Sequence, residues 1–351
     1  MIRIKDIADE LGLSTATVSN VIHGKTKKIS KETVKRVQAL LEEKEYIPNM
    51  AAILLAQNSS KIICLVISAH EKYERRLLQD PFIAALADDL SYEIESHGYF
   101  MMIKRCKEIS EVVRYASMWN MAGLVLTGFC NQDYNELRQN IRIPFVVMDG
   151  FFEPQSKCAN IGIDNIDGGF QVGRYLMEMG HRNILYIADN DEDMDHERYV
   201  GLKKAVDEIN LKKQNKVSKQ GKVQFQKVSI FHEERMKDYE KVLKQIGQIT
   251  AIFCASDAYA IELIGYLIDH HIKIPEAVSI VGFDDIPEAN SIRPRLTTVR
   301  QDIGQRARKA LEFLDTCEEE DEKNFLLPVK LIERESVCYN QRDKNKNSCC
   351  E

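Results

Sequence analysis

The sequence has little of what membrane proteins and disulfide-bonded secreted proteins need. Its longest apolar runs, such as residues 62–67, are far shorter than the roughly 18 residues required to span a bilayer. The nine cysteines are scattered, without a CxxC pair or a His/Cys spacing typical of a metal site. Cys64 and Cys254 lie in apolar runs, which predicts buried reduced thiols, and Cys349 and Cys350 are expected in an exposed tail. Because the N-terminus is charged and has no apolar segment, we expect no signal peptide and a cytoplasmic protein.

The sequence also lacks the motifs of common enzyme classes. No GxGxxG follows the first apolar run, there is no Walker loop or GxSxG, and Gly168-Gly169 lacks the remaining spacing. The eight histidines are dispersed, and the adjacent His270 and His271 would point in different directions on a helix. These absences argue against an enzyme and predict neither a cofactor nor a metal site.

The composition is that of an ordinary globular protein of 351 residues, with 44% hydrophobic and 29% charged residues. This length favours two or three structural units. The net charge of -6 argues against a protein that coats nucleic acid over its whole surface. Residues 1–60, however, carry nine Lys or Arg against seven Asp or Glu, so this segment is about +2 and has room for a local basic face.

Three amphipathic helical patterns and no strand fill the first 45 residues. The first helix stops at Gly12, the second is capped by Ser14 and ends at Gly24, and the third is capped by Ser30. Their apolar faces are Ile4, Ile7, Ala8 and Leu11; Val18, Val21 and Ile22; and Val34, Val37, Leu40 and Leu41. A tight glycine turn before a capped helix is typical of a helix-turn-helix, although any helical hairpin can look this way.

From Lys61 onward, short apolar runs alternate with helical patterns. Strands that are apolar throughout and separated by helices indicate parallel sheets covered on both faces. The expected strands are 62–67, 100–103, 123–127, 145–149, 160–164, 184–188, 223–228, 251–256 and 279–285. The pattern breaks near 150–160 and then restarts, which predicts two doubly wound lobes. Ligands bind outside the carboxyl ends of such strands, so a small molecule is expected between the lobes.

Several stretches resemble the LacI/GalR family of bacterial regulators in the family's order and spacing, over nearly the whole chain. They are IKDIADELGLSTATVSNVIHGKTKKIS (4–30), ISKETVKRVQALLEEKEYIPNMAA (29–52), IGIDNIDGGFQVGRYLMEMGHRNILYIA (161–188), AIFCASDAYAIELIGYLIDHHIKIPEAVSIVGFDDI (251–286) and RPRLTTVRQD (293–302). The resemblance implies a three-helix helix-turn-helix domain followed by an α/β sensor domain with two lobes, similar to periplasmic binding proteins.

On this basis we expect four regions in the chain. They are a helix-turn-helix domain (1–47), a hinge helix or linker (48–60), a two-lobed effector-binding and dimerisation domain (61–340) and a disordered tail (341–351). The lobes are expected at about 61–158 and 160–289, with the chain crossing back after 290.

The resemblance assigns the second helix to the DNA major groove. It places Thr15, Ala16 and Asn20 at base-contacting positions. Asn20 can pair with an adenine edge, and Ala16 can only touch a thymine methyl. Many family members carry Arg at the position of Asn20, so the preferred bases should differ. Ser14, Thr17 and Ser19 lie nearer the phosphates, and His23 completes the expected DNA-binding set. The alternative is that these small polar residues are merely a solvated helix face.

In the family, residues matching 48–56 form a hinge that becomes helical on the operator and inserts a leucine into the minor groove. Leu55 occupies that position, where an apolar wedge can unstack a base step and kink the duplex. Pro48 suits the first turn of such a helix. Ile53 departs from the polar or basic residue of many members, so a packed linker remains an alternative.

The resemblance also implies an effector site built from both lobes. Arg198 matches an arginine that binds effector hydroxyls or carboxylates, and its fork with flanking acids suits polyol or anion recognition. Phe231 could stack on a sugar face or be a core aromatic. Each acid could instead be a loop cap or a surface charge. The full set of expected effector residues is Asp80, Phe82, Asp149, Arg198, Phe231, Ser256 and Asp284.

The sequence therefore predicts a sequence-specific DNA-binding transcriptional regulator, most simply a repressor, controlled by a sugar or sugar derivative. We expect a homodimer on a palindromic operator. Residues 317–351 contain no leucine heptads, so we do not expect a coiled coil that would form tetramers. The alternative from residues 61–340 alone is a solute-binding protein without DNA regulation.

Overall fold

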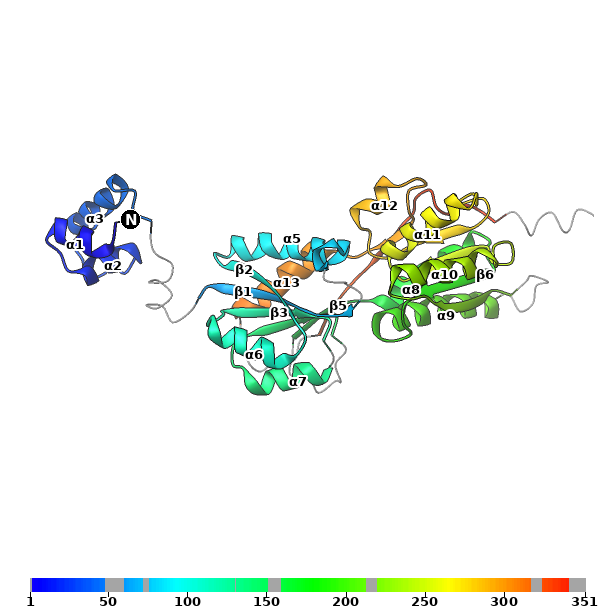
Figure 1. Cartoon of the computed structure of the whole chain (residues 1–351), viewed down its shortest axis with the longest axis horizontal. Helices are drawn as coiled ribbons and strands as arrows, with labels where there is room; N and C mark the ends of the chain where they lie inside the picture. Colours follow the sequence, from blue (N-terminus) through cyan, green and yellow to red (C-terminus); the bar gives the residue numbers. More distant parts are fainter. Residues whose placement is uncertain are drawn as a thin grey trace, which may run out of the picture. The chain divides into compact units, whose positions relative to one another are not determined.

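The computed structural model describes residues 2–47, 60–71, 76–129, 131–150, 159–212, 220–316 and 324–340. The chain divides into two compact units, Met1–Ser60 and Lys61–Glu351, which we describe separately. The first is helical and the second combines helices with sheets (Figure 1). Residues 48–59 of the expected hinge (48–60) and the Cys349-Cys350 tail lie outside the described residues. None of the described helices is long and apolar enough to cross a membrane.

Within residues 2–47, the first unit forms three helices whose ends are set by the local sequence. They are α1 (Ile4–Leu11), α2 (Thr15–Ile22) and α3 (Lys31–Glu43). Gly12 follows α1 with a left-handed φ of 66°, a conformation that glycine adopts without strain. The hydroxyls of Ser14 and Ser30 cap the next two helices, each accepting a hydrogen bond of 3.1 Å from the backbone N–H three residues on. The predicted turn and caps are confirmed.

One residue from each helix forms the centre of the first unit's core. Ile7, Val18 and Val37 are completely buried, and the other predicted apolar residues of the three helices contact this cluster. The apolar faces predicted from the hydrophobic periodicity thus pack together and form the single core of a small three-helix domain.

The second unit contains two parallel sheets. The six-stranded sheet has the order β11-β5-β4-β3-β1-β2 and is parallel throughout. Its strands are β1 (Ile62–Ser68), β2 (Phe100–Cys106), β3 (Gly123–Thr127), β4 (Phe145–Met148), β5 (Ala159–Ile163) and β11 (Asn324–Leu327). Its helices are α5 (Pro81–Ser96), α6 (Ile109–Met118), α7 (Asn131–Asn140) and α13 (Ile303–Thr316), with a short 3-10 helix at Leu77–Gln79.

Helices cover both faces of this sheet (Figure 1). Along β1, Leu65 and Ile67 lie in the core under α5 and α13, whereas Val66 lies in the core under α6 and α7. Because successive side chains of a strand point to opposite faces, both faces must be apolar, as the sequence predicts.

The second sheet has four parallel strands in the order β7-β6-β8-β9. They are β6 (Asn183–Ala188), β7 (Lys222–Lys227), β8 (Ala251–Cys254) and β9 (Ser279–Val281). Tyr186 lies in the core under α8 and α9, and Leu185 in the core under α10 and α11. The helices are α8 (Asn165–Glu178), α9 (Asp193–Lys212), α10 (His232–Leu243), α11 (Asp257–Asp269) and α12 (Pro287–Ser291). An antiparallel pair, β10 (Thr298–Arg300) and β12 (Lys330–Ile332), adjoins this lobe.

The chain crosses between the two lobes three times: from β5 to α8, from β10 to α13, and from β11 to β12. One expectation needs correction. The sequence pattern places strand 160–164 at the start of the second lobe, but β5 pairs with β4 and β11 in the first sheet. An apolar strand shows that it is buried on both faces, not which neighbour it pairs with.

Glycines allow α8 and α9 to touch backbone to backbone. A Cβ on Gly201 would lie 2.0 Å from the carbonyl oxygen of Ile166, and one on Gly169 would lie 2.0 Å from that of Arg198. Both distances are far inside van der Waals contact, so only glycine fits at this crossing. The close approach holds Arg198 of α9 beside Asn165 at the start of α8.

We expect Gly201→Ala to destabilise the protein by about 1–3 kcal/mol, because the added methyl overpacks the helix crossing. Gly265→Ala is the matched control, since Gly265 lies in α11 with no atom within 4 Å of an added Cβ. There, alanine should stabilise the helix by roughly 0.5–1 kcal/mol. Urea unfolding followed by circular dichroism measures both changes, and equal stability of the two variants would contradict the close crossing.

Candidate DNA interface and effector site

The predicted base-contacting residues lie on one exposed side of α2. Thr15, Ala16 and Asn20 are exposed, while Val18 and Val21 on the opposite side are buried in the core of the first unit. Ala16 and Asn20, four positions apart, lie on one face of the helix, and Thr15 adjoins them about 100° around the helix axis. The three side chains therefore form one surface that can enter a groove without disturbing the core. Ser19 and His23 are half-buried beside it.

Ser14 and Thr17 have a structural role at the start of α2. Their hydroxyl oxygens lie 2.8 Å apart in a hydrogen bond, and Ser14 Oγ also accepts the Thr17 N–H. The cap orients both side chains at the positive end of the helix dipole, where phosphates bind favourably.

Three lysines directly after α2 were not among the predicted site residues. Lys25, Lys27 and Lys28 are all exposed. The signal is present in the sequence as the run Lys-Thr-Lys-Lys, because closely spaced lysines supply the point charges that phosphate contacts need. Leu55 lies outside the described residues, so its wedge role stays a prediction.

A buried ion pair lies at the carboxyl end of the first sheet. Asp149 follows β4, and its Oδ2 is 2.5 Å from Nη2 of Arg306 on α13, which is completely buried. Nη2 also donates to the Ile161 carbonyl at 3.2 Å. Asp149 Oδ1 and Arg306 Nε are buried and have no hydrogen-bond partner among the described residues. The predicted Phe82 contributes an aromatic ring, whose centroid is 5.7 Å from the guanidinium carbon.

Gln301 connects this pair to the second sheet. Its Oε1 accepts a hydrogen bond of 2.7 Å from Arg306 Nη1, and its Nε2 donates one of 2.7 Å to Asp284 Oδ1. Asp284 follows β9, just as Asp149 follows β4. A continuous polar chain therefore joins two predicted effector residues from opposite lobes.

Arg198 is buried at the carboxyl end of the second sheet. Its Nε donates to Asn165 Oδ1 at 2.9 Å, and its Nη1 donates to the Ala255 carbonyl at 2.5 Å. The guanidinium carbon lies 3.8 Å from the centroid of the Phe283 ring, which adds a cation–π contact. These partners hold a charge in place that would be costly to bury alone.

Three predicted effector residues are close enough to interact electrostatically. Burial raises the pKa of Asp284 above its usual range, the positive charge of Arg198 opposes this, and the negative charge of Asp80 adds to it. Asp80, Arg198 and Asp284 therefore belong to one electrostatic environment that combines both lobes.

Asp80 and Ser256 both act as helix caps. Asp80 Oδ1 accepts the Ile83 N–H at 3.0 Å, and Ser256 Oγ accepts the Tyr259 N–H at 3.4 Å. For Asp80 this bears out the cap that was considered for each acid. A role in effector binding stays a prediction for both residues. Asp80 has a second carboxylate oxygen that the cap does not use.

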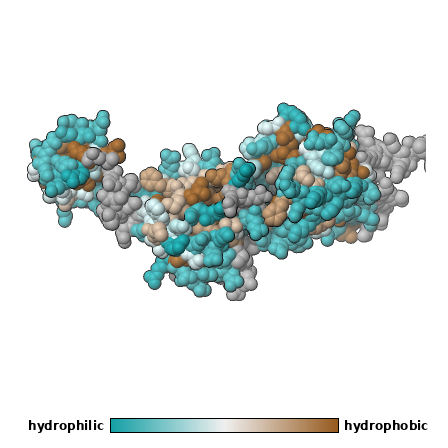
Figure 2. Space-filling model, viewed as in Figure 1, coloured by the Kyte–Doolittle hydropathy of each residue, from teal (hydrophilic) through white to brown (hydrophobic). Residues whose placement is uncertain are grey.

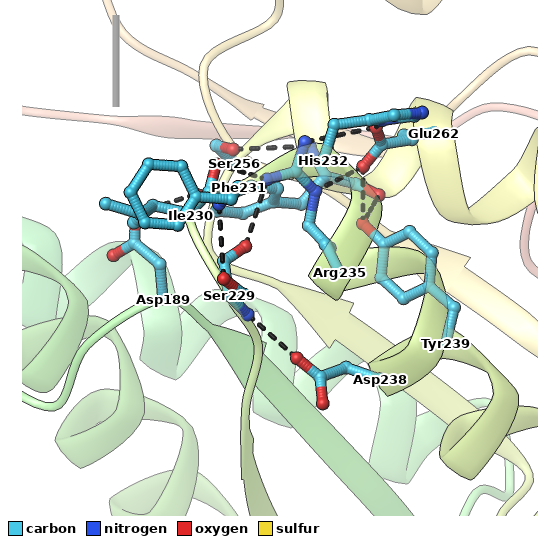
Figure 3. Close-up of polar contacts among 11 residues, drawn as sticks. Asp189, Ser229, Ile230, Phe231, His232, Arg235, Asp238, Tyr239, Ser256 and Glu262 are labelled. Atoms are coloured by element: carbon cyan, nitrogen blue, oxygen red, sulfur yellow. Dashed lines mark hydrogen bonds and ion pairs between the residues drawn. The ribbon is translucent and has the colours of Figure 1, made fainter. Parts of the chain in front are cut away.

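Phe231 lies in the loop before α10, near Ser256 and Asp189 in the view of Figure 3. Its exposed fraction of 39% rules out the core-aromatic alternative.

In the polar chain between the lobes, Gln301 and Arg306 are the two residues that the sequence did not single out. Gln301 is the next-to-last residue of the quoted stretch at 293–302. Arg306 falls on the apolar stripe of α13 with Ile303, Ala307 and Ala310, and this periodicity is the signal that could have marked it as inward-facing.

A helix-turn-helix unit and a two-lobed unit with polar residues at its strand ends together define a ligand-responsive DNA-binding regulator. Residues 3–49 match the family model "Bacterial regulatory proteins, lacI family", and residues 174–337 match "Periplasmic binding protein-like domain". The chain is 31% identical over 350 residues to the transcriptional repressor PurR of Pectobacterium carotovorum, with 96% of the chain and 97% of the relative covered. It is 27% identical to the transcriptional regulator MalR of Clostridium butyricum, covering 96% and 99%.

Solved structures agree in fold. The Lac repressor dimer bound to operator and the anti-inducer ONPF superposes with a TM-score of 0.79 at 20% identity, covering 96% of this chain and 99% of that one. The CelR–cellobiose complex gives a TM-score of 0.65 at 22% identity, covering 96% and 100%. The chain belongs to the LacI family of bacterial transcriptional regulators. The predicted family, fold class and regulatory function are thereby confirmed.

We expect Arg306→Met to destabilise the protein by about 3–5 kcal/mol, because it leaves the Asp149 carboxylate buried without its partner. The double variant Asp149→Asn/Arg306→Met should lose less stability than Arg306→Met, since no buried charge remains at this pair. Arg308→Met is the control on the same helix: its side chain is 53% exposed and pairs loosely with Glu93 at 3.8 Å. It should change stability by less than about 1 kcal/mol in urea unfolding. Equal losses of stability in Arg306→Met and Arg308→Met would show that the buried ion pair stabilises the protein no more than the exposed one.

Proposed function

We propose that this regulator is a repressor that binds a palindromic operator as a homodimer and changes its DNA affinity when a small neutral sugar binds between its lobes. The observation that carries the proposal is the polar chain Asp149–Arg306–Gln301–Asp284, which unites residues at the strand ends of both lobes. A ligand that contacts this series of polar side chains and Arg198 would favour one relative orientation of the two lobes over others. Such coupling between sites is typically about 1–3 kcal/mol and acts in both directions.

The proposed division of the chain follows from this role. Residues 1–47 read DNA, 48–60 act as a hinge, 61–340 bind effector and dimerise, and 341–351 form a tail. A twofold dimer presents two copies of α2 and so requires half-sites related by twofold symmetry. The Lac repressor structure, a dimer on its operator, supports this arrangement. We propose no catalytic activity and a site of action in the cytoplasm.

In the proposed DNA interface, Thr15, Ala16 and Asn20 contact bases. Leu55 acts as the minor-groove wedge. The side chains nearer the phosphates are Ser14, Thr17, Ser19 and His23, with Lys25, Lys27 and Lys28 adding charge. The exposure of this side of α2 supports the assignment.

The proposed effector is a hydroxyl-rich neutral molecule. Asp80, Asp149 and Asp284 offer acceptors, Arg198 offers donors, and Phe231 offers a stacking face, while Phe82 and Ser256 complete the set. Carboxylates disfavour a multiply charged anion and suit hydroxyl donors. Relatives of the same fold bind neutral sugars, namely cellobiose in CelR and ribose in a regulator from Enterococcus faecium.

Selection of bound duplexes from a random DNA pool tests the proposed function, with and without ribose and cellobiose, at one stated salt concentration. Enrichment of a palindrome whose yield changes with one sugar is the expected result. Enrichment without any response to sugars would refute the effector class. Failure to enrich any sequence would refute the operator-binding role.

For Asn20→Ala we expect relaxed base preference at one symmetric pair of operator positions. Loss of a bidentate base contact removes roughly 1–3 kcal/mol of discrimination there. The measurement is the same selection followed by binding titrations on single-base operator variants. Lys35→Ala, which removes an exposed charge on α3, is the control and should leave base preference unchanged. An unchanged preference in Asn20→Ala would remove this residue from the base-reading set.

For Arg198→Lys we expect loss of the response to sugar, with DNA affinity in its absence retained. Lysine keeps the charge but cannot make the forked contacts of a guanidinium, so effector affinity should fall at least tenfold. Isothermal titration with the responsive sugar and DNA-binding titrations separate the two effects. A normal sugar response would place Arg198 outside the effector site.

A further inference from the structure

One guanidinium group holds the loop that carries Phe231. Nη1 of Arg235 donates hydrogen bonds to the carbonyl oxygens of Ser229 and Ile230, at 3.0 and 2.8 Å. The Phe231 N–H in turn donates to Ser229 Oγ at 3.2 Å. Figure 3 shows Arg235 on α10 beside this loop. The backbone directly before an exposed aromatic ring is therefore fixed by a charged side chain.

Glu262 of α11 fixes the guanidinium group. Arg235 Nε and Nη2 make paired contacts with its two carboxylate oxygens, at 2.5 and 3.1 Å. The side chains of Arg235 and Glu262 are only 12% and 24% exposed, so water screens the pair little. Tyr239 also donates to this carboxylate at 3.0 Å, and His232 Nδ1 lies 2.7 Å from it. Such forked, charge-assisted contacts define one geometry.

The same guanidinium lies over the ring of Tyr259 in α11, and Tyr259 contacts the neighbouring loops of the second sheet. The guanidinium carbon lies 5.1 Å from the centroid of the Tyr259 ring. The Tyr259 hydroxyl donates to Asp189 at 2.6 Å, and the Tyr259 N–H is capped by Ser256. Asp189, Ser229 and Ser256 each follow a strand of this sheet. Arg235 therefore binds the loop after β7 directly and is linked through Tyr259 to the loops after β6 and β8.

We propose that Arg235, anchored by Glu262, is a positioning residue of the effector site that holds Phe231 in its binding orientation before the effector arrives. The proposal rests on the proposed role of Phe231 as a stacking face for a neutral sugar. An aromatic ring that is already ordered loses less conformational entropy when the ligand binds, and this raises affinity. Arg235 acts through Phe231 and need not touch the sugar.

The chain allows this to be tested without an effector, because Trp119 is its single tryptophan. In the reporter Trp119→Phe/Phe231→Trp, the fluorescence anisotropy decay follows the ring at position 231 alone. With Arg235 present, we expect slow tumbling of the whole protein to dominate the decay. Adding Arg235→Ala should introduce a nanosecond component, and Arg235→Lys should restore order only in part, because lysine cannot make the forked contacts.

Lys244→Ala is the matched control, since Lys244 makes an exposed ion pair with Glu240 at the end of the same helix. It should leave the decay unchanged. Glu262→Gln provides a second route, weakening the anchor without removing Arg235, in case Arg235→Ala does not fold. An unchanged decay in folded Arg235→Ala or Glu262→Gln would overturn the proposal and leave the pair as a stabiliser of the lobe only.

A second arm measures binding of ribose and cellobiose by isothermal titration. Arg235→Ala should lower the affinity for the responsive sugar roughly threefold to tenfold. In a Phe231→Ala background the same change should have no further effect, because the ring it positions is gone. Equal weakening in both backgrounds would overturn the link to Phe231. If the parent protein binds neither sugar, the proposed effector class fails, while the anisotropy result still decides whether Arg235 positions the ring.

Discussion

The larger unit depends on the burial of two arginine side chains at the carboxyl ends of its sheets. A charge removed from water is strongly destabilising unless hydrogen bonds and opposite charge surround it. Arg306 is surrounded by Asp149, Gln301 and the Ile161 carbonyl, and Arg198 by Asn165 and the Ala255 carbonyl. The acceptors sit at or just after β4, β5, β8 and β10, so the two arginines and these strand ends fix each other's positions.

Local chemistry determines most of what could be predicted from the sequence. Ser14 and Ser30 begin helices because a hydroxyl cap needs only the next three residues. β1 and β6 are recognisable because a strand buried on both faces must be apolar along its whole length. The prediction that Cys64 and Cys254 are buried is confirmed for the same reason. The family motifs then predicted that Asp149, Arg198 and Asp284 belong to one effector site. In the structure, polar contacts link Asp149 to Asp284, and Arg198 lies close enough to Asp284 to affect its pKa.

Long-range pairing determines what could not be predicted. The sequence pattern predicts that β5 is the first strand of the second lobe. Its neighbours are instead β4 and β11, and β11 comes about 160 residues later in the chain. Arg306 lies on the apolar stripe of α13, but its partner Asp149 is far away in the sequence and only the fold brings the two together. Asp80 and Ser256 show a different difficulty, since an oxygen that caps a helix and one that binds a ligand need the same residue types.

The placement of β11 and α13 has a consequence for how the protein is made. Domains fold as units, beginning at the N-terminus during synthesis. The three helices of the first unit are complete once their residues have left the ribosome, whereas the first sheet lacks its last strand and one covering helix until residues 303–327 emerge. A nascent or prematurely terminated chain therefore carries a finished DNA reader on an unfinished sensor.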